Sequence, residues 1–173
     1  ENARDFLKHY LPPQVREQLD LSSLQIRKDS FIDPELQEHY SDLLYKVTWR
    51  GGPEMYIYLL FEHKSYPDPL IAWQLLGYKY KIWQQDRKQK LPFRPILPLV
   101  VYHGQQGWSI SLQFSALFDD LPEALRPFVP EFRYWLYDLS QYSDAEIKAS
   151  VEDAVILQVV LLLLKYILRD DVR

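Results

Sequence analysis

The sequence contains no cysteine and only five glycines among 173 residues. Without cysteine the chain forms neither a disulfide nor a thiolate metal site, and it suits a reducing compartment such as the cytoplasm, where we expect the protein. The few glycines form neither a phosphate-binding Walker loop nor a dinucleotide-binding fingerprint, and no serine lies in a nucleophile elbow. Several common classes of enzyme are therefore excluded.

The chain also lacks an excess of positive charge, a signal-peptide pattern and a long apolar run. Its formal net charge is −4, which argues against a histone-like nucleic-acid binder but allows a local basic groove. The most apolar stretch covers residues 154–168, whereas a membrane span needs roughly 20 residues. We therefore expect a helix covered by the core or by a partner, and no membrane association. The first residue is Glu1 rather than Met, which indicates a fragment or a trimmed chain.

The composition that remains is that of one folded domain, with 47% hydrophobic, 25% charged and 15% aromatic residues. Patterning predicts a helix over residues 2–20, broken at "LPPQ", and then strands near residues 21–33, 41–49 and 55–65. A helix of about 20 residues follows, capped by Asp68 and with Pro69 in its first turn.

The second half of the chain continues this alternation. "FRPILPLVVYHG" and "RYWLYDLS" are strand-like, and "QQGWSISLQF" is an edge strand or a loop. Ser143 and Glu146 form a capping box that opens one long helix through residue 168. The order of elements predicts a single α/β domain with a mixed sheet over residues 1–173.

The apolar strand "YIYLLFEHKS" (residues 56–65) ends in charged residues. Glu62 and Lys64 share a face because side chains alternate along a strand. Asp42 comes from the preceding strand. If residues 51–53 form a three-residue loop, Asp42 lies directly opposite Glu62, with Cβ atoms about 5 Å apart. A two-residue loop instead places the two carboxylates on opposite faces.

Two carboxylates beside an ammonium form a site of hard oxygen ligands. Asp42, Glu62 and the backbone carbonyl of His63 would hold Mg²⁺ or Mn²⁺, and water and phosphate oxygens would complete the octahedron. Lys64 would orient or deprotonate the attacking water, or neutralise charge that develops on phosphorus. The arrangement suits phosphodiester hydrolysis. However, E-x-K is a common tripeptide, and a strand end that reaches solvent with a Glu–Lys pair explains it at least as well.

Three segments together resemble the recombination-promoting nuclease family, whose members are often labelled transposases. The segments are "SLQIRKDSFIDPELQEHYSDLLYKV", "YIYLLFEHKSYPDPLIAWQLLGYKYKIWQ" and "LPLVVYHG", and the resemblance covers nearly the whole chain. This family belongs to the PD-(D/E)XK, restriction-endonuclease-like superfamily. The resemblance implies a central mixed β-sheet flanked by helices, and a metal-dependent DNA endonuclease linked to recombination and mobile elements.

The motifs of the superfamily map onto individual residues of this chain. The resemblance places the first acidic motif on Asp42 and the (D/E)-x-K motif on Glu62 and Lys64. Many members of the family carry glutamine at the position of Lys64, so the lysine here fits the superfamily pattern better. The resemblance also implies that N- and C-terminal segments of the family are missing. Asp5 and Glu17 are weak stand-ins for a helix acid from that region.

Other residues are candidates for supporting roles. Gln74 and Tyr78 form Q-x-x-x-Y, which resembles a motif of recombination exonucleases in the superfamily, and they share a helix face. Alternatively, Tyr78 packs in the core and Gln74 is solvated. His103 either lines the site at a strand end or is a hydrogen-bonded structural histidine. The side chain of His63 faces away from the carboxylates and is interpreted as structural.

Basic and aromatic residues of the same helix have two interpretations. The basic set either faces DNA phosphates or forms an ordinary solvated face, and it comprises Lys79, Lys81, Arg87, Lys88 and Lys90. Leu70, Trp73, Leu76, Tyr80 and Trp83 fall at helical spacing. This spacing predicts that the aromatic residues Trp73, Tyr80 and Trp83 face the core rather than stacking on bases.

The sequence thus favours a Mg²⁺-dependent deoxyribonuclease. The main alternative is a catalytically inactive DNA-binding domain of the same fold. A further alternative is a dimerisation module built on the apolar C-terminal helix, with a homodimer as its product. The last alternative is a metal-dependent hydrolase that acts on RNA or on another phosphodiester.

Overall fold

The computed structural model describes residues 2–27, 41–62, 66–104, 106–150 and 155–166. A five-stranded sheet in the order β1-β2-β3-β4-β5 forms its centre. Its strands are β1 (Leu19–Ile26), β2 (Ser41–Trp49), β3 (Glu54–Glu62), β4 (Ile96–Tyr102) and β5 (Trp135–Asp138). The first three strands are antiparallel, and β3, β4 and β5 are parallel. The mixed sheet confirms the predicted restriction-endonuclease-like α/β class.

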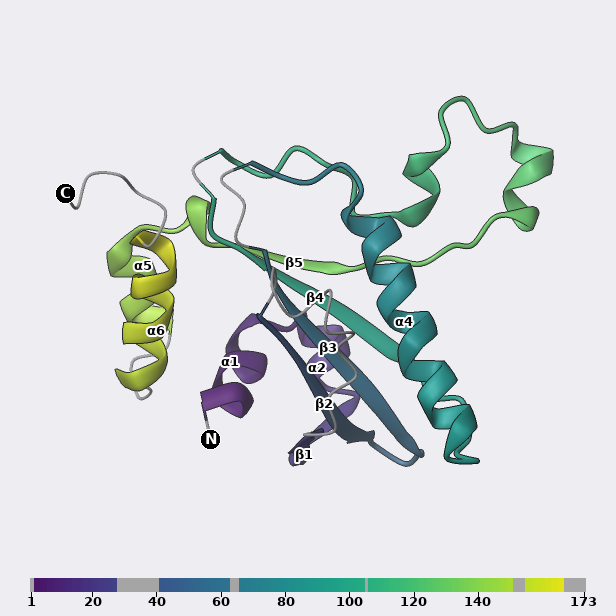
Figure 1. The fold of residues 1–173 in the computed structure, drawn as a ribbon. Coiled ribbons are helices and arrows are strands. Elements are labelled where there is room, and N and C mark those ends of the chain that lie inside the picture. The colour runs from purple at the N-terminus through teal and green to yellow at the C-terminus, as the bar shows by residue number, and fades with distance from the viewer. Residues whose placement is uncertain (1, 28–40, 63–65, 105, 151–154, 167–173) are drawn as a thin grey trace.

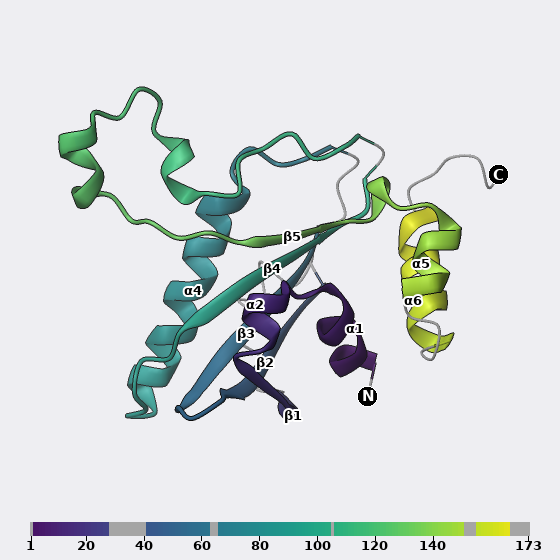
Figure 2. The ribbon, with the colours of Figure 1, turned by 180° about the vertical axis from the view of Figure 1, so that it is seen from behind.

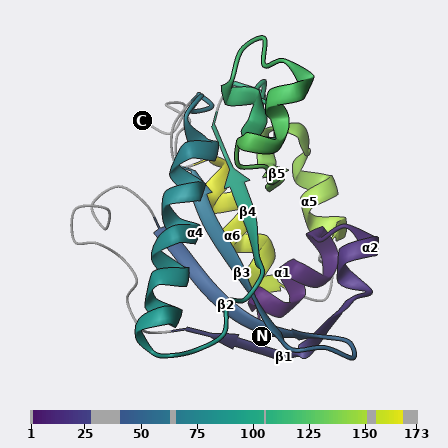
Figure 3. The same cartoon turned by 90° about the vertical axis from the view of Figure 1, so that its right-hand side faces the viewer.

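Helices cover both faces of this sheet (Figures 1 and 3). The α-helices are α1 (Asn2–Tyr10), α2 (Pro13–Arg16), α4 (Ile71–Lys88), α5 (Asp144–Ser150) and α6 (Val155–Tyr166). The described residues also form the 3₁₀-helices η1 (Phe114–Leu117), η2 (Glu123–Phe128) and η3 (Leu139–Gln141). α4 lies on one face, and α1 lies on the other. The break predicted at "LPPQ" separates α1 from α2.

Strand β3 is buried on both faces, which explains its almost continuous apolar run. Tyr58 and Leu60 belong to the core layer under α4. Ile57 and Leu59 belong to the opposite layer, with residues of α1, α5 and α6. The parallel pairing with β4 places this strand at the centre of the sheet, where both faces need cover.

The prediction that the aromatic residues of α4 face the core holds in part for Trp83, which is half-buried and packs against the core. It is wrong for Trp73 and Tyr80. The side chains of Trp73 and Tyr80 are 63% and 61% exposed. The buried face is instead aliphatic and is centred on Ile71, Leu75 and Ile82. Two adjacent stripes of α4 both show helical spacing, and the aliphatic one fits closely against the sheet. The buried residues are Ile71, Ala72, Leu75, Tyr78, Lys79, Ile82 and Asp86.

A polar network fixes the C-terminal end of α4 to the sheet. The Tyr56 hydroxyl donates to Asp86 Oδ1 at 2.8 Å and accepts a hydrogen bond from Arg27 Nη1 at 2.8 Å. Arg94 reaches Asp86 Oδ2 at 3.4 Å and Glu54 Oε2 at 2.8 Å. Burial, together with the Asp86 carboxylate, raises the pKa of Tyr56 to about 12. The buried carboxylate is thus held by a hydroxyl and two guanidinium groups.

The predicted long C-terminal helix is also wrong, because the described residues form two helices, α5 and α6. Lys165 Nζ lies 2.7 Å from Asp144 Oδ1, whereas a straight helix would separate two residues 21 positions apart by about 30 Å. The two helices lie side by side in Figures 1 and 2. The predicted capping box is confirmed, since Glu146 N donates to Ser143 Oγ at 3.2 Å and Ser143 N donates to Glu146 Oε2 at 2.7 Å.

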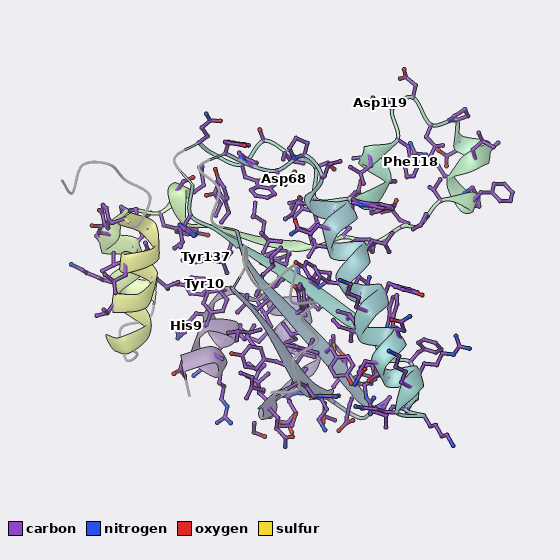
Figure 4. All side chains as sticks on the ribbon, viewed as in Figure 1. His9, Tyr10, Asp68, Phe118, Asp119 and Tyr137 are labelled. Atoms are coloured by element: carbon purple, nitrogen blue, oxygen red, sulfur yellow. The ribbon has the colours of Figure 1, made fainter. Side chains whose placement is uncertain are left out.

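Between β4 and β5 the chain leaves the sheet and forms an arm that carries η1 and η2. Figure 4 labels Phe118 and Asp119 on this arm, beyond the N-terminal half of α4. Residues 106–113 of the segment "QQGWSISLQF" lead into the arm as a loop rather than a strand, and Gln113 makes an isolated bridge to Arg133. Among the helices that the structure describes, none has the length and apolarity to cross a membrane.

Candidate active site

The hairpin of β2 and β3 carries Asp42 and Glu62. The last pair before its turn is Thr48 opposite Glu54, and residues 50–53 connect the end of β2 to the start of β3. In this connection Gly52 N donates to Trp49 O at 3.1 Å, and Gly51 has a φ of 74°, which favours glycine. The predicted three-residue loop is therefore wrong. Asp42 lies opposite Leu60 instead of Glu62.

The observed register still assigns positions 42 and 62 to one face of the sheet. It differs from the predicted register by two residues, which is one full period of a strand. Position 62 lies two residues beyond Leu60 and is therefore a diagonal neighbour of position 42. Such neighbours are about 7–8 Å apart. The register that would place the two positions on opposite faces does not occur.

The groups that would perform the chemistry belong largely to residues outside the described set. The structure describes the backbone but not the side chains of Asp42 and Glu62, and it does not describe residues 63–65. The predicted roles of Asp42, Glu62 and Lys64, and of the His63 carbonyl, therefore remain predictions. Within the described ranges, no three His, Asp or Glu side chains form a group that could hold a metal ion. The donors that the sequence provides at the hairpin end are carboxylate and carbonyl oxygens, which Mg²⁺ prefers.

Helix α4 covers the face that contains positions 42 and 62. The Tyr78 ring packs against the Tyr58 ring of β3, with centroids 5.0 Å apart. Gln74 lies one turn before Tyr78 on the same flank of α4. Both residues line a hollow of about 290 Å³ together with Trp73, Gly77 and Lys81. The structure thus brings the two Q-x-x-x-Y residues to one flank, while Tyr78 also packs in the core.

The carboxyl ends of β3, β4 and β5 meet at one edge of the sheet. Glu62 pairs with Tyr102, and Tyr102 pairs with Asp138, so these positions form one row. His103 follows β4 directly and is buried. Such an edge of parallel strands commonly lines a site.

Asp138 is a buried carboxylate at this edge that the sequence analysis did not single out. It accepts hydrogen bonds from Trp108 N at 3.1 Å and Ser140 N at 2.9 Å, and Gln141 Nε2 lies 3.4 Å away. The carboxylate therefore braces the two loops that leave β4 and β5. Its position at the end of a strand-like run was the available signal in the sequence.

The five basic residues considered for DNA contacts do not form one stripe, although Lys90, directly after α4, is exposed. Lys79 is only 8% exposed, and its ammonium lies 4.1 Å from the Phe132 ring centroid. Burial lowers the pKa of Lys79, so this lysine is a core residue rather than a phosphate contact. Lys81 is half-buried and lines the hollow, whereas Arg87 and Lys88 are exposed in the last turn of α4.

Comparison with known proteins identifies the family of this chain. The family described as "Putative transposase, YhgA-like" matches residues 1–173. The chain belongs to this YhgA-like transposase family. No solved structure matches it significantly.

Curated relatives of this YhgA-like chain carry nuclease names. It is 34% identical over 149 residues to the recombination-promoting nuclease RpnA of Escherichia coli strain K12, which covers 85% of this chain and 50% of the relative. It is 36% identical over 117 residues to the recombination-promoting nuclease RpnD of Escherichia coli O157:H7, which covers 64% of this chain and 44% of the relative. A third relative, 34% identical over 149 residues, is named the inactive recombination-promoting nuclease-like protein RpnE of strain K12, and the match covers 85% of this chain and 49% of that relative. The chain thus spans about half the length of these relatives.

Proposed function

We propose that this domain binds DNA and hydrolyses its phosphodiester bonds with the aid of Mg²⁺ or Mn²⁺. The hairpin register carries the proposal, because it assigns positions 42 and 62 to one face at the end of a rigid central strand. The names of the relatives RpnA and RpnD, which describe nucleases that promote recombination, support it. The lysine of the E-x-K tripeptide supports it further, since this residue type suits water activation beside a metal.

Each residue has a separate role in this proposal. Asp42, Glu62 and the backbone carbonyl of His63 hold the cation through oxygen atoms. When bound, the cation polarises the phosphoryl oxygens and lowers the pKa of water. Lys64 orients the attacking water or neutralises charge on the phosphate. Gln74 orients the DNA strand from the flank of α4, beside Tyr78.

Plasmid nicking in the presence of Mg²⁺ or Mn²⁺ tests this function. We expect Asp42→Ala and Lys64→Ala each to reduce nicking by roughly two orders of magnitude, because Asp42 holds the cation and Lys64 orients the water or neutralises charge on the phosphate. Asp119→Asn is the matched control, since Asp119 is an exposed carboxylate on the arm (Figure 4). It should nick plasmid at the wild-type rate. Equal nicking by the wild type and both site variants would contradict the proposal.

A second candidate function is DNA binding without cleavage. The match to RpnE, which is named inactive, favours it specifically. A gel-shift experiment separates the two candidates. Retention of DNA by a wild-type protein that does not nick plasmid with either cation would select the inactive binding domain. A wild-type protein that neither retains DNA nor nicks plasmid would leave the dimerisation alternative. Light scattering tests that alternative by measuring the mass of the protein in solution.

A further inference from the structure

The exposed face of α4 has an unusual composition for a chain with a net charge of −4. Two large aromatic rings, Trp73 and Tyr80, lie mostly in solvent. Asp86 is the only acidic residue within α4, and it is completely buried. The exposed face of this helix therefore carries aromatic, amide and cationic groups without a carboxylate. Such a face is complementary to a polyanion that also presents flat rings.

Gly77 adds an independent observation on the same face. It lies in the middle of an 18-residue helix, where glycine is among the least favourable residues. A Cβ atom built at Gly77 would meet no atom of the described residues within 4 Å, so no neighbour among them requires glycine there. Gly77 instead forms part of the hollow between Trp73 and Lys81. A ligand that crosses the helix closely at this point would account for the missing side chain.

We propose that the α4 outer face, defined as Trp73, Gly77, Tyr80 and Lys81, binds unpaired nucleotides of a DNA strand. The identity of the ligand as DNA rests on the proposed function. Every base offers a flat surface on which an indole or phenol ring stacks, whereas bases within a duplex already stack on each other. Trp73 and Tyr80 are seven residues apart, which corresponds to about 10 Å along the helix. Each ring stacks on a base, and the strand backbone crosses at Gly77, where Lys81 contacts a phosphate.

Packed side chains connect the hollow with the hairpin that carries the candidate active site. Its remaining lining residues are Gln74 and Tyr78, and Tyr78 packs on Tyr58. Tyr58 pairs with Leu44 in β2, and position 42 lies two residues from Leu44, about 7 Å along the strand. These contacts connect the flank of α4 that borders the hollow with the strand pair that carries position 42. We expect the α4 outer face to select single-stranded or frayed DNA for cleavage at the end of the hairpin.

Fluorescence anisotropy in EDTA measures this binding without cleavage. The probe is a fluorescein-labelled oligothymidylate of about 12 nucleotides, a length typical of single-strand sites. We expect Trp73→Ala to weaken binding at least about fivefold, because one stacked base is lost, and Trp73→Phe to retain most of the affinity. Gly77→Leu should weaken binding similarly by filling the hollow. Lys81→Gln should reduce the slope of log K against log salt by about 0.7.

Phe128→Ala is the matched control, since Phe128 is an exposed aromatic residue on η2, away from this face. It should bind the probe like the wild type. Wild-type affinity in Trp73→Ala, or binding of duplex but not of the single-stranded probe, would overturn the proposal. A change of oligomeric state in Trp73→Ala with unchanged DNA binding would show a contact between copies instead, and would also overturn it.

The nuclease proposal and this inference fail separately. Binding of the probe through Trp73 by a protein that never nicks plasmid would support the α4 outer face and reject the nuclease. Normal nicking that depends on Asp42, combined with probe binding that does not depend on Trp73, would support the nuclease and reject the α4 outer face as the binding surface.

Discussion

At the scale of single residues, we expect the stability of the fold to depend strongly on Asp86. Its carboxylate is fully buried and receives the Tyr56 hydroxyl and Arg94. Asp86→Ala would remove the buried acceptor of this hydroxyl and the carboxylate that lies 3.4 Å from Arg94. We expect a loss of about 3–5 kcal/mol in the free energy of unfolding, as for other broken buried pairs. Urea unfolding followed by circular dichroism measures it.

Arg87→Ala provides the matched control for this prediction. Arg87 is the next residue along α4 but is exposed, and exposed substitutions usually change stability by less than about 0.5 kcal/mol. Tyr56→Phe should fall between the two variants, because it removes one buried hydroxyl and leaves the charges paired. Equal stability of Asp86→Ala and Arg87→Ala would show that the network contributes little.

At the scale of elements, α4 contains a residue that weakens it without packing benefit. Gly77 has open space where a Cβ atom would lie. We expect Gly77→Ala to raise the free energy of unfolding by about 1 kcal/mol, because alanine is the more favourable residue in a helix interior. The corresponding rise in melting temperature is about 2–4 °C. Calorimetry measures this change, and an unchanged or lower melting temperature would contradict the open geometry at Gly77.

The elements also show which features local sequence determines. The capping box at Ser143 and the strands of the central hairpin were predicted correctly, because each depends on residues within one or two turns or on strand alternation. The stripe of α4 was not, because Trp73 and Leu75 both belong to stripes with helical spacing and only the packing surface selects between them. The break between α5 and α6 depends on Lys165 meeting Asp144, which is a tertiary contact.

In the candidate site, too, some features follow from local sequence and others depend on tertiary structure. Strand alternation was sufficient to assign Glu62 and Lys64 to one face in the prediction. The pairing partner of Asp42 depended on the turn, where a connection of residues 50–53 replaced the expected loop of residues 51–53. Burial of Lys79 under Phe132 depends on a segment about 50 residues later in the chain, so no local pattern could have indicated it.

At the scale of the whole molecule, anchoring differs between the two ends of α4. Its C-terminal end is tied to β1, β3 and the segment before β4 by Arg27, Tyr56, Asp86 and Arg94. Its N-terminal half carries Trp73, Gln74 and Gly77 and borders the hollow instead. The sheet and the network thus fix the direction of α4, while its other half presents polar and aromatic groups near the candidate site.

Ion pairs at the periphery make the stability of the whole molecule depend on acid pH. Lys46 Nζ lies 2.7 Å from Glu54 Oε1, and this contact, followed by Arg94, holds the pKa of Glu54 below its usual value of 4.5. Hydrogen bonds from Lys165 and then Tyr166 lower the pKa of Asp144 below 3.8. A lowered pKa in the folded state means that the unfolded state binds more protons. These carboxylates therefore stabilise the fold above their unfolded pKa values, and that stabilisation is lost as the pH falls through their folded values.

We expect the free energy of unfolding to be nearly constant from about pH 7 to pH 5 and to fall progressively below about pH 4.5. Urea titrations at a series of pH values measure it. Glu54→Gln should flatten part of the acid limb, because the variant has no carboxylate to protonate at that position and its stability at neutral pH is already reduced. Glu131→Gln, at an exposed position on the arm, should leave the pH dependence as in the wild type. A free energy of unfolding that stays constant to about pH 3 would mean that these ion pairs do not contribute to folding.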